Sequence, residues 1–404
     1  MFGHKKTSDP RLIVVYTIGS TRVTASILEI QLDAITCVYT TQSPLDHQEQ
    51  LDLERLTHSM LSALKKVSVQ IQKEGLQKVR TVLGYDGVFD SFICIYTAPW
   101  FVSQTRMVTL KRKKAFVVTS KLTSKLLNDE ITTFKKNLLE ENSPYKHLVG
   151  ADVVDAYSIR TKVNDYKTKK PFGKQANSLT LSVYVSLMSS EMLRQTHELL
   201  KNTFHTDAIQ CYSSTLVTYL ATESLFKGYN SYLILEVNGE ITDVSIVKDG
   251  VLLETASYPA GTNNLIRFVS QKTKLTKDDI LSRLKLMTLA QTDRSTKKTE
   301  EVESMVYEAV SEWMQGLHRA LERVSKGSPV PQVAFLLIDP VWEVLYQTAL
   351  KDHSTELFTF SNHPFTVITI NPEFVSQHVE RKEGTDFLPL MLLTGIMHKK
   401  LPGN

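Results

Sequence analysis

The chain has 404 residues, of which 42% are hydrophobic and 22% charged, the composition of an ordinary soluble globular protein of two or more domains. Its 47 basic and 43 acidic residues leave a net charge of +4, too balanced to argue for a nucleic-acid partner. The cysteines at 37, 94 and 211 are odd in number and far apart, which favours core residues in a reducing compartment over disulfides or a zinc site. No apolar run approaches the roughly 20 residues of a membrane span, and residues 1–11 show no secretion signal, so we expect a cytoplasmic protein.

The first hundred residues predict three strands, a helix and a fourth strand. The three apolar runs lie at 12–18, 23–30 and 35–41. Apolar residues between Leu53 and Ile71 then fall at helical spacing, and Gly75 stands where such a helix would stop. The fourth strand covers 92–96 and is closed by Pro99.

Residues 102–188 have a different pattern, that of a small inserted α+β unit. Strands at 105–110 and 115–119 are predicted to bracket a basic turn, Lys111–Lys114, before a helix over 122–139. Further strands at 153–163 and 179–187 flank a polar stretch. The basic turn could contact anionic headgroups or an acidic partner, or it could simply be solvated. Residues 165–174 could form a binding loop or a long hairpin loop.

The rest of the chain alternates helices and strands. A helix from 189 or 190 to 204, a strand at 208–212 and a helix over 214–225 precede two successive hairpins at 232–253, whose turns contain Asn238-Gly239-Glu240 and Asp249-Gly250. Later elements are predicted as helices at 276–287, 300–326, from 341 and at 386–398, strands at 333–338 and 365–370, and an exposed loop at 292–299. The sequence has no Walker-type motif, GxGxxG or solenoid repeat.

Three strings, taken with their order and spacing, resemble the FtsA/PilM group of bacterial actin-like proteins over essentially the whole chain. Residues 16–23, Tyr-Thr-Ile-Gly-Ser-Thr-Arg-Val, are similar to the first phosphate loop of the group. Residues 236–243, Glu-Val-Asn-Gly-Glu-Ile-Thr-Asp, are similar to the second. Residues 258–265, Tyr-Pro-Ala-Gly-Thr-Asn-Asn-Leu, are similar to the strand-to-helix turn that follows it.

The resemblance implies an α/β, actin-like (ribonuclease H-like) two-domain fold with a 1C-type subdomain inserted in its first half. The implied units are 9–101 and 189–228 for subdomain 1A, 102–188 for 1C, 229–385 for the second domain (2A and 2B), and 386–404 for a C-terminal helix that packs back on 1A. Residues 387–398 are accordingly expected to pack in the core. The alternative is a membrane anchor, because a helix with such an apolar face could also bind a membrane.

The resemblance also implies a nucleotide site. Its residues here would be Gly19, Ser20, Thr21, Glu236, Asn238, Gly239, Thr242, Asp243, Gly261, Thr262 and Asn263. A purely structural interpretation stands beside it: two hairpin turns, local hydrogen bonds that close them, and a helix start capped by Thr262 or Asn263. No catalytic residue and no metal-binding cluster can be assigned from spacing.

The departures from the group's motifs argue against ATP hydrolysis. Tyr16 is matched to the Asp that helps hold Mg²⁺ in the group, although Glu236 could stand in for the second loop's Asp. Asn238 and Glu240 replace two of three glycines, and Ile241 replaces a hydroxyl donor. The adenosine-side string at 335–342 has no glycine. We therefore expect a degenerate ATPase with no cofactor, ATP with Mg²⁺ being the alternative.

The function that the resemblance implies is that of a scaffold or adaptor of a membrane-associated machine, most like PilM of type IV pilus assembly. Its partner would be the cytoplasmic tail of an inner-membrane protein, which would hold it at the inner face of the cytoplasmic membrane. The alternatives are an FtsA-like cell-division protein, or an ATP-binding actin-like ATPase that self-associates into filaments. No nucleic-acid partner is expected.

Overall fold

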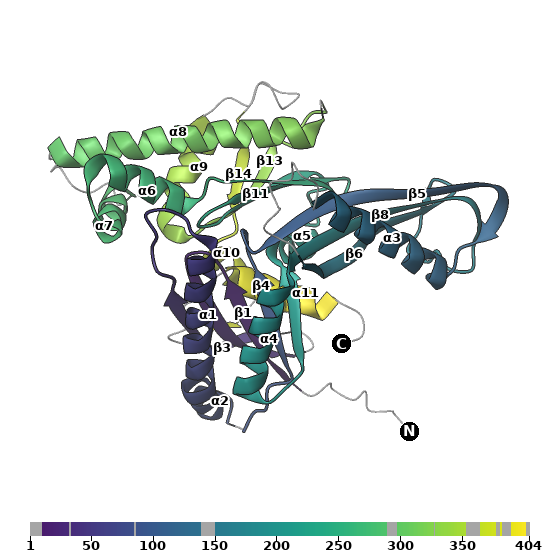
Figure 1. The fold of residues 1–404 in the computed structure, drawn as a ribbon, viewed down its shortest axis with the longest axis horizontal. Coiled ribbons are helices and arrows are strands. Elements are labelled where there is room, and N and C mark those ends of the chain that lie inside the picture. The colour runs from purple at the N-terminus through teal and green to yellow at the C-terminus, as the bar shows by residue number, and fades with distance from the viewer. Residues whose placement is uncertain are drawn as a thin grey trace.

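The protein is described from a computed structural model. The structure describes residues 10–31, 34–84, 86–138, 150–288, 297–326, 328–352, 364–376, 380–381 and 389–400. Three β-sheets organise these residues, two of them in the body and one in an arm that projects from it (Figure 1).

The first sheet has the order β15-β3-β2-β1-β4-β9. Its strands are β1 (Arg11–Ile18), β2 (Arg22–Ile30), β3 (Ile35–Pro44), β4 (Ser91–Tyr96), β9 (Ile209–Ser213) and β15 (Glu380–Arg381). The first three form an antiparallel meander, and β4 and β9 then add in parallel on the other side of β1. Alternate residues of β1 face opposite sides, so Val14 packs with helix α1 (Leu53–Gln70) while Val15 packs with α5 (Ser214–Leu225).

The second sheet repeats this connection order as β12-β11-β10-β13-β14. Its strands are β10 (Tyr232–Val237), β11 (Thr242–Lys248), β12 (Val251–Tyr258), β13 (Val333–Leu337) and β14 (Thr366–Thr369). Its outer face is covered by α6 (Thr262–Thr273), α7 (Lys277–Thr288), α8 (Lys297–Ser325) and α9 (Glu343–Asp352). The inner faces of both sheets pack on α5 and α11 (Pro389–Lys400), whose Met391, Leu393 and Met397 are buried.

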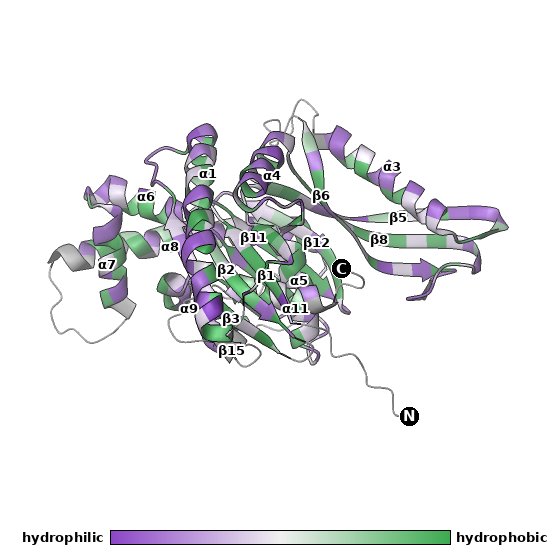
Figure 2. Ribbon diagram, turned by 90° about the horizontal axis from the view of Figure 1, so that it is seen from below, coloured by the Kyte–Doolittle hydropathy of each residue, from purple (hydrophilic) through white to green (hydrophobic). Residues whose placement is uncertain are grey.

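The third sheet, β5-β8-β6-β7, forms the arm. Its strands are β5 (Phe101–Val117), β6 (Ala151–Val163), β7 (Tyr166–Lys167) and β8 (Gln175–Ser189), and α3 (Ser120–Leu138) covers one face. Helix α4 (Ser190–Phe204) returns the chain to the first sheet. Figure 2 shows the hydrophobic residues concentrated on the central strands and the hydrophilic ones on the outer helices and the far end of the arm.

The hairpin predicted around Lys111–Lys114 is wrong. Residues 101–117 form one strand, and its register with β8 shifts between Lys111 and Phe116, so the basic residues bulge out of the ladder without reversing the chain. The side-chain amide of Asn177 on β8 donates to the carbonyls of Arg112 and Lys113 and holds the bulge. Four consecutive basic residues suggested a turn. Instead they stay within one strand, because Asn177, far along the chain on β8, bonds the bulged backbone.

Gly75 does not end the first helix. α1 continues through the π-helical turn η1 (Ile71–Gly75) into α2 (Leu76–Leu83), and Gly84, with φ 76°, ends it. A Cβ on Gly75 would lie 2.7 Å from Ile27 Cδ1, so this glycine lets the helix approach the sheet.

Smaller boundary differences concern the other predicted helices. The loop predicted over 292–299 is helical from Lys297, and 292–296 lie outside the described residues. The last helix begins at Pro389, and 386–388 also lie outside them. The helix predicted from 341 begins as the short helix η3 (Pro340–Trp342) and continues as α9, whereas the short helix α10 (Pro372–Ser376) was not expected from the sequence. No helix in the described ranges combines the length and the apolar character needed to cross a membrane.

Candidate functional site

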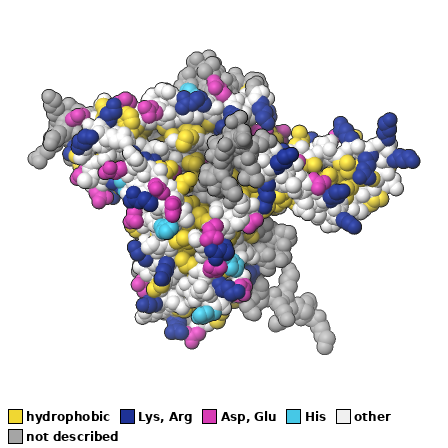
Figure 3. Space-filling view, viewed as in Figure 1, with side chains coloured by type: hydrophobic (Ala, Val, Ile, Leu, Met, Phe, Trp, Pro, Cys, Tyr) yellow, Lys and Arg dark blue, Asp and Glu magenta, His cyan; other side chains and the backbone are white. Residues whose placement is uncertain are grey.

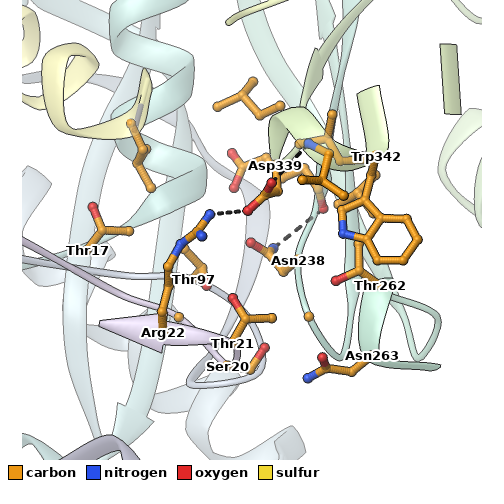
Figure 4. A pocket seen from close by; sticks show the side chains of 18 of the residues that line it. Thr17, Ser20, Thr21, Arg22, Thr97, Asn238, Thr262, Asn263, Asp339 and Trp342 are labelled. Atoms are coloured by element: carbon orange, nitrogen blue, oxygen red, sulfur yellow. Dashed lines mark hydrogen bonds and ion pairs between the residues drawn. The ribbon is translucent and has the colours of Figure 1, made fainter. Parts of the chain in front are cut away.

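A cavity of about 420 Å³ lies between the two halves of the body (Figure 4). The first half contributes the end of β1 and the β1–β2 turn, including Thr17 and Arg22. The second half contributes the β10–β11 turn, the start of α6, Lys277 of α7, and Asp339 and Trp342 around η3. The cavity is therefore an interdomain cleft at the turns of paired strands.

Most of the predicted nucleotide residues line this cavity. They are Gly19, Ser20, Thr21, Glu236, Asn238, Gly239, Thr262 and Asn263. Thr242, Asp243 and Gly261 lie behind the lining, in the second half. The structure thus brings the three strings of the sequence together at one place.

Thr242 and Asp243 make contacts that stabilise the second half. The Thr242 hydroxyl donates to the Ala260 carbonyl at 2.6 Å and accepts from Trp313 Nε1 of α8 at 2.9 Å. The Asp243 carboxylate accepts from the Ser257 hydroxyl at 2.5 Å. Burial, with the nearby Glu236 carboxyl adding to it, raises the pKa of Asp243 to about 7.

Helix α6 begins one residue earlier than expected, with Gly261 as its N-cap rather than Thr262 or Asn263. The Gly261 N–H donates to the Asn264 side chain at 2.9 Å. A Cβ on Gly261 would lie 2.4 Å from the carbonyl oxygens of Asn238 and Gly239, so only glycine fits here without a backbone shift.

The first amides of α6 are bonded to the β10–β11 turn. The Thr262 N–H donates to the Asn238 carbonyl at 2.9 Å, and the Asn263 N–H donates to the Gly239 carbonyl at 2.7 Å. Free amides at a helix start are a ready anion site. In this protein, backbone carbonyls occupy two of them.

The β1–β2 turn and the β10–β11 turn touch each other. The Glu240 N–H donates to Ser20 Oγ at 3.2 Å. A Cβ on Gly239 would lie 2.6 Å from both Ser20 Oγ and Thr21 Cγ2. The two turns that resemble phosphate loops are thus in direct contact across the cleft.

The Glu240 carboxylate is almost fully buried, its side chain being 3% exposed, and it is paired within the protein. Nη2 and Nη1 of Arg267 on α6 donate to it, at 2.5 and 3.1 Å, and Asn263 Nδ2 donates at 2.7 Å. Glu240 was identified from the sequence only as the replacement of a phosphate-loop glycine, and its partner Arg267 was missed. The available signal was the spacing of Asn263 and Arg267, which places both on one helical face.

Another ion pair, between Arg22 and Asp339, joins the two halves across the cleft. Arg22 of β2 donates to the Asp339 carboxylate, as Figure 4 shows. The other oxygen of Asp339 accepts from the Val341 N–H at 3.1 Å, so the residue also caps η3. The dipeptide Asp339-Pro340 could have suggested a helix cap. Nothing in the sequence indicated that Asp339 would pair with Arg22, which is 317 residues away.

Tyr16 was matched to the wrong position. Its side chain is fully buried on the α1 side of the sheet, where Ser68 Oγ donates to the Tyr16 hydroxyl at 3.2 Å and burial raises the Tyr16 pKa. Thr17, the next residue, lines the cleft because successive side chains on a strand point to opposite faces. Thr17 is therefore the residue to compare with the Mg²⁺-holding Asp, and its hydroxyl is equally unable to supply a carboxylate.

Three buried side-chain oxygens of residues that line the cleft have no hydrogen-bond partner within the described residues. They are Thr17 Oγ1, Glu236 Oε1 and Asn263 Oδ1. The other Glu236 oxygen accepts from the Ser214 hydroxyl at 2.5 Å, and burial raises the pKa of Glu236. Nowhere in the described ranges do three His, Cys, Asp or Glu side chains gather as a metal site would require. A polyphosphate would need the backbone amides of the second turn and of the start of α6 as donors. In this arrangement the amides of Glu240, Thr262 and Asn263 already donate to protein oxygens, so the site does not fit a polyphosphate.

The duplicated strand order, the cleft between the halves and the inserted sheet together define an actin-like α/β fold. No protein-family model matches the chain. No curated protein matches it by sequence either.

Comparison with solved structures supports the same class. A chain of the PilM-PilN type IV pilus biogenesis complex superposes with a TM-score of 0.58 at 11% identity, covering 96% of this chain and 99% of that one. A protein from Bacteroides thetaiotaomicron VPI-5482 with actin-like ATPase fold and unknown function gives 0.36 at 12% identity, over 98% of both chains. The ethanolamine utilization protein EutJ from Carboxydothermus hydrogenoformans gives 0.39 at 11%, over 97% and 91%. The first superposition confirms the predicted actin-like fold, and at 11% identity the likeness shows the fold alone.

Proposed function

We propose that this chain is a scaffold protein of a membrane-associated machine, in a role like that of PilM, and that it acts by binding proteins rather than by hydrolysing ATP. The observation that carries the proposal is the direct contact between the two phosphate-loop-like turns, with the Glu240 N–H bonded to Ser20 Oγ. A polyphosphate bound between such turns needs their amides as donors. Here the Glu240 amide donates to the Ser20 hydroxyl of the other turn instead.

The electrostatics of the cleft support the same interpretation. Arg267 neutralises the buried Glu240 carboxylate, and Arg22 is paired with Asp339. Phosphoryl transfer depends on cations that neutralise phosphate charge and on a correctly held metal. Two of the cationic side chains near the cleft are instead committed to carboxylates of the protein.

The partner in this proposal is the cytoplasmic tail of an inner-membrane protein. The support is the likeness to a chain of the PilM-PilN complex, which covers nearly the full length of both chains. Such a partner would place the chain at the inner face of the cytoplasmic membrane. The arm, proposed as a 1C-type subdomain over 102–188, and the adjoining 1A subdomain are the surfaces to examine first.

The test is titration of the purified chain with synthetic peptides of the cytoplasmic tails of candidate single-pass membrane proteins, the counterpart of PilN first. We expect one tail to bind, with the same affinity whether or not ATP and Mg²⁺ are present. Scrambled peptides of equal charge are the control. Binding that appears only with ATP, or no binding by any tail, would contradict the proposal.

A nucleotide-binding actin-like protein is the second candidate. It is favoured by Thr17 Oγ1 and Glu236 Oε1, which lie at the cleft without partners in the described part of the chain. Lys277 also lines the cavity, and burial lowers its pKa. For this candidate, the two turns must first separate.

A further inference from the structure

The far end of the arm carries more positive charge than the chain's whole net excess of +4. Two segments, 109–121 and 161–178, meet there and contain ten Lys or Arg residues and one Asp. The cations are Lys111, Arg112, Lys113, Lys114, Lys121, Lys162, Lys167, Lys169, Lys170 and Lys174. Because the whole chain has 47 basic and 43 acidic residues, the remainder carries 37 and 42 and is net acidic. We call these two segments the basic tip.

The charges of the basic tip are available to a ligand. All ten side chains are exposed except that of Lys162, which is half-buried. None of the ten forms an ion pair with any residue in the described ranges. Figure 3 shows Lys and Arg side chains gathered at this end of the molecule. The like charges repel one another there, and Asp165 is the single carboxylate among the residues of the basic tip.

The backbone of the basic tip is tied down. Asn164 Oδ1 accepts from the N–H groups of Asn177 and Ser178, at 2.8 and 3.1 Å. The Gly173 N–H donates to the Val118 carbonyl, and the Val118 N–H donates to the Lys174 carbonyl, both at 2.9 Å. The cations are therefore displayed on a folded surface and not on a loose loop.

Two aromatic side chains stand among these cations. Tyr166 is 80% exposed and Phe172 is 59% exposed. Water-exposed aromatic rings on a monomer are costly, and their natural surroundings are an interface between polar and apolar media. Exposed aromatics interspersed with lysines are typical of protein surfaces that lie on membranes.

We propose that the basic tip docks the arm on an anionic lipid surface, with Tyr166 and Phe172 entering the headgroup layer. Nine of the ten cations are Lys, whose hydrated point charge suits the diffuse potential of anionic headgroups, whereas bidentate phosphate recognition in nucleic acids favours Arg. This contact is separate from the tail-binding role proposed above and does not depend on it. It gives the chain a direct membrane contact in addition to one through a partner.

The test is co-sedimentation of the full chain with phosphatidylcholine vesicles that do or do not contain phosphatidylserine. We expect binding only to the anionic vesicles, lost at about 1 M salt, where the Debye length is about 3 Å. Replacing Lys111, Lys113, Lys114 and Lys169 by Gln should weaken binding at least about tenfold. A control replaces the exposed Lys65, Lys66, Lys73 and Lys227 by Gln, which removes the same charge from the body and should change binding little.

A second readout locates the contact. Trp100, Trp313 and Trp342 are buried, so Phe172→Trp adds an exposed reporter. Its emission should shift to the blue with anionic vesicles and stay unchanged with neutral ones. Equal loss in both lysine variants, or no shift at position 172, would overturn the proposal. So would single-stranded RNA binding at physiological salt that depends on the tip lysines while vesicles do not bind.

Discussion

Glycines at the cleft are explained by packing between protein groups. Gly239 lies against Ser20 and Thr21, and Gly261 lies against two carbonyl oxygens of the β10–β11 turn. Both positions were predicted as nucleotide contacts from their resemblance to phosphate loops. In the structure the same close approach joins one turn to another and to α6.

Gly261→Ala should therefore destabilise the protein even without any nucleotide. The new Cβ would lie 2.4 Å from backbone oxygens, which cannot rotate away, and overpacking of this kind costs about 1–3 kcal/mol. Gly228→Ala is the matched control, because nothing lies within 4 Å of its added Cβ, and it should change stability by less than about 0.5 kcal/mol. Thermal melting compares them, and equal melting temperatures would refute the packing argument.

The raised pKa of Asp243 leads to a prediction of how the stability of the protein depends on pH. Burial raises its folded pKa to about 7, whereas an unfolded Asp has a pKa of about 3.9. Between these values the folded state keeps a proton that the unfolded state has lost, so stability falls as pH rises from about 4 to about 7, by up to roughly 1.4 kcal/mol per unit. The Asp243 contribution is fully favourable below pH 4 and is lost above pH 7.

Asp243→Asn removes this titration and keeps the side-chain volume. The variant should become more stable than the parent as pH rises above about 5, with the largest difference near pH 8 and little at pH 4. Melting curves from pH 4 to pH 8 measure it. Parallel curves for the two proteins would show that the Asp243 carboxyl is ionised throughout.

The residues that sequence reasoning missed share one cause. Arg22 and Asp339 lie within strings that were compared with the group's motifs and Arg267 lies outside them, but nothing in the sequence indicated the charged partner that the fold gives to each. The error at Tyr16 had a different cause, a shift of one residue that reversed the face of the strand. Motif spacing predicted which turns meet, but it could not predict how their charges are paired.

At the scale of elements, buried strands were the most predictable features. β1, β10 and β13 are short apolar runs with turn residues nearby, and they lie where the sequence placed them. The errors were at β5 and at Gly75, where a strand and a helix continue through residues that usually end them. In both places the reason is tertiary: Asn177 holds the bulge, and Ile27 needs the space that Gly75 leaves.

The helix through Gly75 gives a prediction by double substitution. Gly to Ala inside a helix normally gains up to about 1 kcal/mol, but here Gly75→Ala should cost about 1–3 kcal/mol because its Cβ would lie 2.7 Å from Ile27 Cδ1. Ile27→Val removes that carbon. In the Ile27→Val background, Gly75→Ala should cost clearly less, and thermal melting of the four proteins measures the coupling. The same cost in both backgrounds would refute the steric explanation.

For the whole molecule, the actin-like fold followed from element order and motif order together. The closed contact of the cleft did not, since it depends on residues more than 200 positions apart, such as Ser20 and Glu240. The subdomain boundaries implied by the resemblance stay a prediction, and the packing of α5 and α11 between the two body sheets joins these sheets through a shared core cluster.

The Arg22–Asp339 pair should help to hold the two halves together. Its side chains are 27% and 31% exposed, so we expect a coupling of only about 1 kcal/mol. Arg22→Met and Asp339→Asn should each speed hydrogen exchange of the 238–243 amides by roughly fivefold, and the double variant no further. Asn at 339 can still cap η3. Arg194→Met, which breaks an exposed pair on α4, should leave these amides unchanged, and additive effects of the two cleft substitutions would argue against the pairing.

The most direct test of the account is calorimetric titration of the chain with ATP and Mg²⁺. The cleft contacts between Ser20 and Glu240 and between Arg22 and Asp339 predict no detectable binding at millimolar nucleotide. Micromolar binding would show that these contacts open readily and that Thr17 and Glu236 still form a nucleotide site. That result would contradict the scaffold interpretation and favour an ATP-regulated actin-like protein.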